Sequence, residues 1–344
     1  MINLPVPFSL WMQPTKRSNL PRSLLAYDVS VPGAAELPLS RMKELLQEVF
    51  DREVISTFFE GGEPFLREDF LDLVRYSTPN AFTIVRTNGT LVDRDVAKAL
   101  KDASVGVACV DLEGATASTH EALVRTPGAY DRTINGIRSL VAAGVPTFVT
   151  AILNRINAGE MQALLDLTAD LGAEKLGILR LYPLGVSRRH WDALSMTLEA
   201  QTAVLDALQT PPDVQLMRSW HPSDPNCCWQ MAAIDAYGNS IGCPYLRDFA
   251  NYGSVVDAPF MDTWRNKKYI EVRSASVEGA CTDCAATDKN RSGGCRSTAY
   301  AFHGRWDAPD PYCSTMNQGV DLTVLPDWLV HHPAGPPSLE DADR

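Results

Sequence analysis

Apolar runs alternate with amphipathic segments from residue 40 to residue 208, and this alternation restricts the possible folds more than any other feature of the chain. Strands that are apolar throughout must be covered on both faces, and the helices that separate them make neighbouring strands parallel. The pattern predicts an α/β fold, a partial (β/α)6 TIM-type barrel with functional groups at the carboxyl ends of its strands. The strands are expected at residues 7–12, 54–59, 81–87, 105–111, 146–153 and 175–184.

A change of composition divides the chain after "QTPPDVQ" (209–215). Beyond this segment the helical period fades and Cys, Gly, Pro, Asn and Asp become frequent, which is typical of a loop-rich domain held together by metal. The predicted domains are a barrel at 1–215, a Cys-rich domain at 216–320 and a tail at 321–344. The tail is Pro-rich and then acidic, so we expect about its last ten residues to be disordered.

The charge of the chain argues against two classes of partner. It carries 31 Lys and Arg against 42 Asp and Glu, a formal net charge of −11, and such a field repels nucleic acids and anionic membranes. No run approaches the roughly 20 apolar residues of a membrane span, and the N-terminus lacks a basic segment followed by an apolar core. We therefore expect a cytoplasmic protein that contacts neither nucleic acid nor membrane.

Cysteines concentrate in the last third of the chain, which holds seven of the eight: Cys227, Cys228, Cys243, Cys281, Cys284, Cys295 and Cys313. In a reducing cytosol such a cluster is more typical of metal binding than of disulfides. More than four thiolates are offered, which favours iron–sulfur over the alternative, a zinc-stabilised scaffold. The role of Cys227 stays open, because adjacent side chains diverge along an extended chain. Cys109, alone in a predicted strand, is interpreted as a small buried hydrophobe.

The motif "FFEGGEPFL" (58–66) follows a predicted strand directly. Gly61 and Gly62 would let backbone N–H groups approach a ligand closely, Glu63 can accept a hydrogen bond from an ammonium group, and Pro64 fixes the turn. The alternative interpretation is a tight turn with an exposed acid.

Polar residues also mark later strands. Asn88 follows one strand within "RTNGT", although Asn-Gly alone is a turn signal. Asp111 and Glu113 end the next strand in "VDLEG", where the alternative is a pair of solvated loop carboxylates. Arg180 lies in an apolar run, so its guanidinium needs an anion, either a ligand or a neighbouring Asp.

Together these residues resemble the radical SAM superfamily with a C-terminal SPASM domain, over nearly the whole chain. "GGEP" (61–64) resembles the element that holds the amino group of S-adenosylmethionine, and "TNGT", residues 120–144 and "LRLYPLG" (179–185) resemble later βα units. The resemblance implies a cofactor site at Gly61, Gly62, Glu63, Pro64, Asn88, Asp111, Glu113 and Arg180. It also implies one auxiliary 4Fe–4S cluster on Cys228, Cys243 and Cys295, and a second on Cys281, Cys284 and Cys313.

The chain departs from this family in "TKRSNLPRSLLAY" (15–27). Family members hold their catalytic cluster there with Cys-x-x-x-Cys-x-x-Cys, and the matching positions are Ser18, Arg22 and Leu25. Residues 1–108 contain no Cys and no His, the side chains that iron–sulfur centres need. A usual fifth SPASM cysteine is also absent near Asn290 and Arg291, which leaves one iron open or bound by an oxygen ligand such as Asp288.

Two functional hypotheses follow from the resemblance and its departures. In the first, the protein keeps one or two auxiliary clusters and its S-adenosylmethionine pocket but starts no radical. It acts as a non-catalytic partner that presents a peptide or supports an intact radical SAM paralogue, and Arg22 would offer charge to an anion. In the second, it is an enzyme that uses S-adenosylmethionine or an open cluster iron for polar or Lewis-acid chemistry.

Overall fold

Parallel strands dominate the computed structural model, which describes residues 4–27, 30–220, 228–274, 277–278, 281, 284, 293–317 and 319–338. The six strands expected from the sequence are present: β1 (Ser9–Met12), β2 (Ser56–Phe59), β3 (Phe82–Thr87), β4 (Val107–Asp111), β5 (Thr147–Ile152) and β6 (Lys175–Leu179). Each pairs in parallel with the next along the chain. The predicted α/β fold is confirmed. β6 ends earlier than predicted, because the chain leaves the sheet at Arg180 and Pro183 lacks a backbone donor.

Two further strands extend this sheet at its edges. β7 (Gln215–Arg218) pairs with β6, and β8 (Met231–Ile234) pairs with β1, with Ser9 opposite Met231. The order in the described part of the chain is therefore β7-β6-β5-β4-β3-β2-β1-β8. The sheet continues past residue 215, where the sequence predicted that the barrel domain would end.

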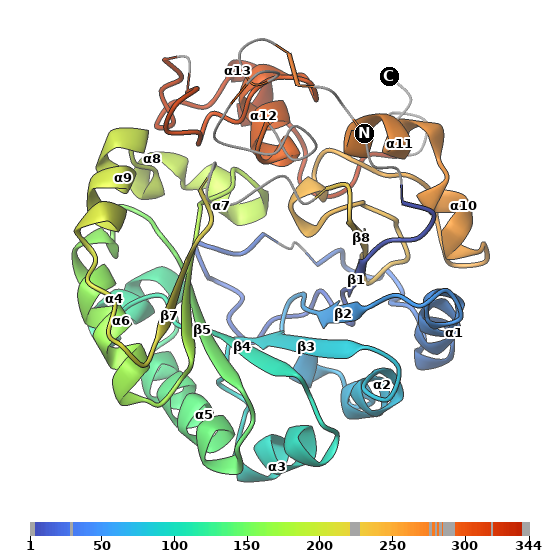
Figure 1. Cartoon of the computed structure of the whole chain (residues 1–344), viewed down its shortest axis with the longest axis horizontal. Helices are drawn as coiled ribbons and strands as arrows, with labels where there is room; N and C mark the ends of the chain where they lie inside the picture. The colour runs from blue at the N-terminus through green and yellow to red at the C-terminus, as the bar shows by residue number, and fades with distance from the viewer. Residues whose placement is uncertain are drawn as a thin grey trace.

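Helices cover the outer face of the sheet, and α1, α2, α3 and α5 are seen along it in Figure 1. Their buried residues recur at helical spacing, as in α1, where Met42, Leu45, Leu46 and Val49 enter the core. α5 ends at Gly144, whose φ of 74° and N–H bond to Leu140 O form a left-handed cap. The helices of this layer are α1 (Leu39–Phe50), α2 (Phe70–Ser77), α3 (Arg94–Asp102), α5 (Ala129–Ala143) and α6 (Met161–Asp170), and α4 (Ala117–Val124) packs beside α5 and against the loop after β1.

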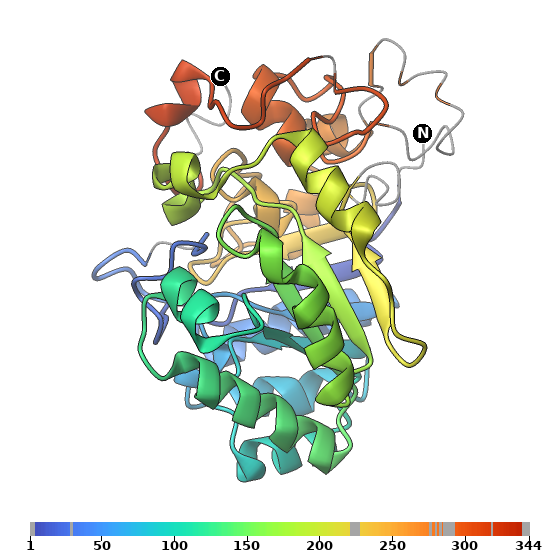
Figure 2. The ribbon, with the colours of Figure 1, turned by 90° about the vertical axis from the view of Figure 1, so that its left-hand side faces the viewer.

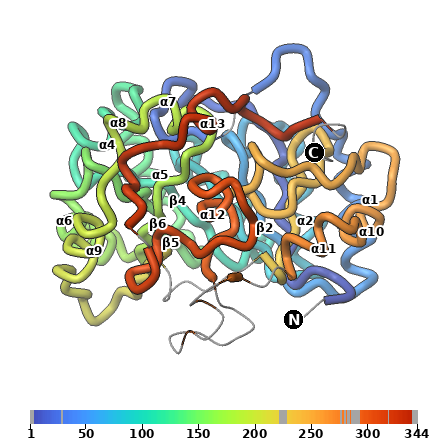
Figure 3. Tube along the Cα trace, turned by 90° about the horizontal axis from the view of Figure 1, so that it is seen from above, coloured from blue at the N-terminus to red at the C-terminus, as the bar shows by residue number. Residues whose placement is uncertain are grey.

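The C-terminal region lies over one end of the barrel. Figure 2 shows it above the strands, and Figure 3 shows α12 across the middle of the molecule from above. Tyr312 Oη donates to Leu181 O at 2.8 Å, and Trp191 Nε1 donates to Leu322 O at 2.9 Å. The remaining helices are α7 (Gly185–Arg189), α8 (Trp191–Leu194), α9 (Leu198–Ala207), α10 (Phe260–Trp264), α11 (Lys267–Ser274), α12 (Arg296–His303) and α13 (Asp327–Val330), with 3₁₀ turns η1 (Pro64–Leu66), η2 (Ala158–Glu160) and η3 (Pro244–Leu246).

The predicted tail contains structure of its own. Helix α13 lies in it, and His332 Nε2 is 2.7 Å from Asp248 O. Residues 339–344, within the segment expected to be disordered, lie outside the described residues. No described helix is long and apolar enough to cross a membrane.

Candidate functional site

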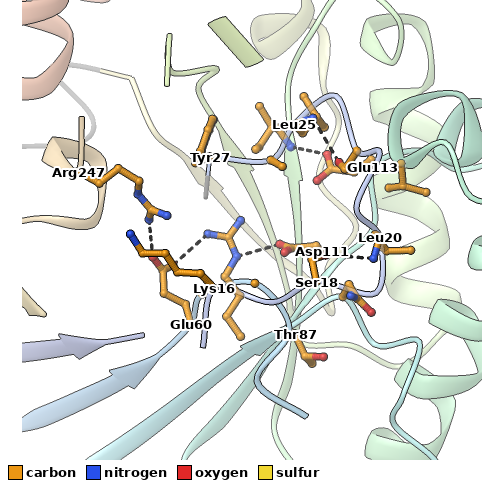
Figure 4. Close-up of a pocket in the computed structure, with 18 of the residues that line it drawn as sticks. Lys16, Ser18, Leu20, Leu25, Tyr27, Glu60, Thr87, Asp111, Glu113 and Arg247 are labelled. Carbon is orange, nitrogen blue, oxygen red and sulfur yellow. Dashed lines mark hydrogen bonds and ion pairs between the residues drawn. The ribbon is translucent and has the colours of Figure 1, made fainter. Parts of the chain in front are cut away.

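A cavity of about 130 Å³ lies at the carboxyl ends of β2 to β5 (Figure 4). Carboxyl ends of parallel strands are where the sequence predicted functional groups. The C-terminal region completes the wall, so the cavity lies between the two parts of the chain. Its lining consists of Lys16, Ser18, Leu20, Ser23, Leu25, Ala26, Tyr27, Glu60, Gly61, Gly62, Arg86, Thr87, Asn88, Asp111, Glu113, Val124, Ile152, Tyr245 and Arg247.

The loop after β1, residues 13–27, forms much of this wall and is packed by apolar side chains. Leu20 lies in a cluster with Val124 and Ala129, while Leu24 and Leu25 pack among Leu123, Ile152, Leu181, Trp191 and Leu194. Ser18 is half-buried and lines the cavity, whereas Arg22 is exposed and does not line it. The expectation that Arg22 supplies positive charge here is therefore wrong.

Gly61 and Gly62 hold this loop against β2. Gly62 N donates to Thr15 O at 3.0 Å, and Glu63 N donates to Arg17 O at 2.7 Å. A Cβ on Gly62 would lie 1.9 Å from Arg17 O, and one on Gly61 would lie 2.4 Å from Thr15 O. Both glycines line the cavity, but close approach of the protein's own backbone already requires them.

Glu63 is fully buried, so the alternative of an exposed acid is wrong. Its carboxylate accepts hydrogen bonds from Thr87 Oγ1 at 2.8 and 2.9 Å, from Asn88 N at 2.9 Å and from Phe65 N at 3.2 Å. Burial raises its pKa to about 7. The structure places neither Glu63 nor Pro64, which starts η1, in the cavity lining.

Asn88 and Asp111 reach the cavity from neighbouring strands. The Asn88 side chain also shapes its own turn, because Oδ1 accepts from Thr90 N at 2.9 Å while Nδ2 donates to Asn19 Oδ1 at 2.8 Å. Asp111 accepts from Arg86 Nε at 2.9 Å and from Thr150 Oγ1 at 2.6 Å. It is thus an ion-paired wall residue, not a solvated loop carboxylate.

Three cations line the cavity that the sequence analysis did not select, and carboxylates pair with all of them. Lys16 Nζ is 2.9 Å from Asp235 Oδ2, and Glu60 bridges Arg86 Nη1 at 3.5 Å and Arg247 Nη2 at 3.0 Å. Figure 4 shows Lys16, Glu60 and Arg247 gathered on one side. Arg86, like Arg180, is a guanidinium within a predicted apolar strand, so it could have been selected from the sequence on the same ground.

Glu113 lies on the other side, beside Leu25 (Figure 4). Only 5% of this residue is exposed. Its Oε2 accepts from Ile152 N at 2.9 Å, and its own N–H donates to His120 Nδ1 at 3.1 Å. Burial, followed by repulsion from Asp111, raises the pKa of Glu113 to about 8. The neutral acid is therefore the major form near pH 7.

This raised pKa predicts how stability changes with pH. Between its ordinary value of 4.5 and about 8, the folded protein keeps a proton on Glu113 that the unfolded chain has released, so this residue lowers the free energy of unfolding as pH rises. Glu113→Gln removes that penalty. We expect the variant to gain stability relative to the parent between about pH 5 and about pH 9, as measured by urea unfolding. A difference that stays constant over this range would contradict the raised pKa.

Arg180 lies away from the cavity lining and has its anion within the protein. Its Nη1 is 2.6 Å from Asp310 Oδ2, and both side chains are fully buried. Asp310 Oδ2 also accepts from Cys295 N at 2.8 Å, and Oδ1 accepts from Thr298 Oγ1 at 2.7 Å and from Tyr312 N at 3.0 Å. The structure therefore favours the alternative of core pairing with an Asp, and the pair links the end of β6 to the Cys-rich region.

The cysteines fall into two neighbourhoods. Cys243 hydrogen-bonds to Cys228 and lowers the pKa of that thiol. Burial raises the pKa of Cys295, Arg180 lowers it, and Asp310 and then Cys228 raise it further. Burial, then the charges of Cys313 and Cys284 among smaller effects, raises the pKa of Cys281. Within the described ranges, no three His, Cys, Asp or Glu side chains are arranged to hold one metal ion. Cysteine thiolates are nevertheless the ligands that iron–sulfur clusters require, and both neighbourhoods supply them. Cys227, Asp288, Asn290 and Arg291 lie outside the described residues.

Comparison with protein families gives two matches. A model of the radical SAM superfamily matches residues 26–168, and a model of an iron–sulfur cluster-binding domain, SPASM, matches residues 227–285.

Individual proteins similar to this chain include three of different stated activities. Mycofactocin maturase MftC of Mycobacterium tuberculosis is 29% identical, over 82% of this chain and 76% of that protein. The AdoMet-dependent heme synthase of Methanosarcina barkeri is 27% identical, over 83% and 89%. The PqqA peptide cyclase of Rhodopseudomonas palustris is 26% identical, over 82% and 80%.

Solved structures share the fold. Streptococcus suis SuiB aligns with a TM-score of 0.71 at 14% identity, over 90% of this chain and 77% of SuiB. SuiB bound to its precursor peptide SuiA aligns with a TM-score of 0.70 at 15% identity, over 90% and 76%. At these identities the likeness shows a common architecture only.

Proposed function

We propose, on the premise that the chain carries a radical SAM domain at 26–168 and a SPASM domain at 227–285, that it is an iron–sulfur protein which does not start radical chemistry by itself. It binds auxiliary 4Fe–4S clusters and S-adenosylmethionine, and it acts with a partner enzyme. The observation that carries this proposal is the loop after β1, which offers no thiol or imidazole and packs Leu20, Leu24 and Leu25 into apolar clusters.

The reason is the chemistry of the donors. A catalytic cluster in this loop needs soft ligands, and Ser18, Arg22 and Leu25 supply a hydroxyl, a guanidinium and an isobutyl group. These residues do not fit a cluster, so we assign none to the barrel. Without an inorganic centre beside the cofactor, no electron reaches the sulfonium, and its carbon–sulfur bond is not cleaved homolytically.

The auxiliary clusters are assigned to the thiols of the Cys-rich region. Cys228, Cys243 and Cys295 would hold one, and Cys281, Cys284 and Cys313 another. The electrostatic coupling within each group supports this division. The cavity residues Gly61, Gly62, Asn88, Asp111 and Glu113 would surround S-adenosylmethionine.

A peptide is the favoured substrate class of the pathway. Two similar proteins are named for peptide chemistry or maturation, the PqqA peptide cyclase and mycofactocin maturase MftC. The AdoMet-dependent heme synthase keeps a small metabolite as the alternative. In either case an intact radical SAM paralogue would perform the radical step that this chain lacks.

The decisive assay is release of 5′-deoxyadenosine from S-adenosylmethionine. After anaerobic reconstitution and reduction with dithionite, we expect iron and sulfide to be bound but no 5′-deoxyadenosine above background, with an intact family member as positive control. Cys281→Ala should lose roughly four irons per chain, whereas the buried Cys109→Ala should lose none. Conversion of S-adenosylmethionine to 5′-deoxyadenosine by the purified chain would contradict the proposal.

Polar chemistry on S-adenosylmethionine is a second candidate, which one observation favours. Glu113 lines the cavity, and its pKa of about 8 suits a group that donates or accepts a proton near neutral pH. Methyl transfer to a nucleophile would leave S-adenosylhomocysteine. Its appearance in the same assay, detected by mass spectrometry, separates this candidate from a non-catalytic partner.

A further inference from the structure

The charges on one side of the cavity are already balanced. Lys16 is paired with Asp235, Arg86 with Asp111, and Arg247 with Glu60, at 2.9, 2.9 and 3.0 Å. Each guanidinium or ammonium group thus has a carboxylate within the protein. A ligand anion entering here would have to compete with a bonded carboxylate, which makes this wall a poor anion site.

Glu113 is the exception among the acids that line the cavity. No cation of the described residues forms an ion pair with it, and only Oε2 accepts a hydrogen bond, from Ile152 N at 2.9 Å. Its backbone is fixed on both sides, because N–H donates to His120 Nδ1 and C=O accepts from Asn157 Nδ2 at 2.9 Å. The second oxygen, Oε1, has no hydrogen-bond partner among the described residues, and it belongs to a cavity wall that also contains the apolar side chains of Leu25, Val124 and Ile152.

We infer that Glu113 Oε1 binds a positively charged group, a sulfonium or an ammonium, on the small molecule that occupies the cavity. This inference rests on the proposed S-adenosylmethionine site and gives it a counter-ion. A charge desolvated by the apolar side chains around Glu113 is stabilised only if an opposite charge is close. The chain would thus hold the cofactor's cation with a carboxylate, a group that attracts it electrostatically and delivers no electron.

Proton release gives this site a signature that a structural role would not produce. Burial and then Asp111 raise the pKa of Glu113, and the hydrogen bond from Ile152 N and the charge of Arg86 lower it. Burial lowers the pKa of His120, which accepts from the Glu113 backbone N–H, to about 4. Near pH 7 Glu113 is therefore mostly protonated and His120 neutral. A bound cation favours the carboxylate, so about one proton leaves with each ligand bound.

Calorimetry with three probes tests the inference: S-adenosylmethionine, the neutral thioether S-adenosylhomocysteine and the small cation trimethylsulfonium. Titrations in two buffers of different ionisation enthalpy count the released protons. For the parent chain we expect tighter binding of S-adenosylmethionine than of S-adenosylhomocysteine. Glu113→Gln should weaken the binding of S-adenosylmethionine on the order of tenfold or more and abolish proton release. It should leave the affinity for S-adenosylhomocysteine unchanged. Glu174→Gln, an exposed acid away from the cavity, is the matched control.

The outcomes separate this inference from the proposed function. Equal affinity of the parent for both nucleosides, or equal weakening of both by Glu113→Gln, overturns the counter-ion and leaves the nucleoside site standing. If neither nucleoside binds, the proposed S-adenosylmethionine site is wrong, and the titration with trimethylsulfonium then tests the cation site alone. Saturable heat that is lost in Glu113→Gln then supports the cation site, and its absence in the parent overturns it.

Discussion

Asp310→Asn is expected to lower the free energy of unfolding by roughly 3–5 kcal/mol. The substitution removes the carboxylate charge 2.6 Å from the Arg180 guanidinium, and both side chains are fully buried. A buried charge that loses its partner costs far more than the intact pair contributes. Urea unfolding of parent and variant prepared with equal iron content measures the difference.

Two further variants make this result specific. Asp321→Asn changes an exposed carboxylate in the same part of the chain, whose hydrogen bonds go to Thr323, and should change stability little. Arg180→Met in the Asp310→Asn background removes the buried positive charge that Asp310 faced and should recover part of the loss. If Asp310→Asn unfolds like the parent, the pair is not the link between the barrel and the Cys-rich region.

Gly62→Ala is expected to cost roughly 3 kcal/mol. Its Cβ would lie 1.9 Å from Arg17 O and 2.8 Å from Lys16 C, and these are backbone atoms that cannot rotate away. The loop after β1 would have to move, and the bond from Glu63 N to Arg17 O would be lost. Thermal and urea unfolding measure the loss of stability.

Gly159→Ala is the matched control, because nothing lies within 4 Å of its added Cβ and its φ is not positive. It should leave stability unchanged or slightly raised. Equal behaviour of the two variants would mean that the loop does not need the close approach at Gly62.

Local apolar pattern was enough to predict six strands, and pairing between distant segments explains what it missed. β7 alternates exposed and half-buried residues at a sheet edge, so "QLMR" carries no apolar run. β8 is only "MAAI" and lies where composition predicts loops. Its place in the sheet depends on β1, which no short-range signal reveals.

Residues of the candidate site could be predicted where a polar side chain directly follows a predicted strand, because functional groups gather at the carboxyl ends of parallel strands. Asn88, Asp111 and Glu113 were selected on that ground, and all three line the cavity. The pairing of Lys16 with Asp235 and of Arg247 with Glu60 was not predictable, since each joins the barrel to the Cys-rich region. Close approach of a ligand or of another stretch of backbone can each require the glycines in "GGEP". Only the three-dimensional structure shows that backbone atoms of Thr15 and Arg17 are what approaches them.

The parallel pairing of β1 with β8 has a consequence for synthesis. Until Met231–Ile234 has left the ribosome, one edge of Ser9–Met12 presents backbone N–H and C=O groups with no neighbour strand. The nascent chain therefore carries an unpaired strand edge through most of translation, and the sheet is completed at this edge only by a contact of high sequence separation. A chaperone that shields this edge would protect the protein at the stage when it is most prone to aggregate.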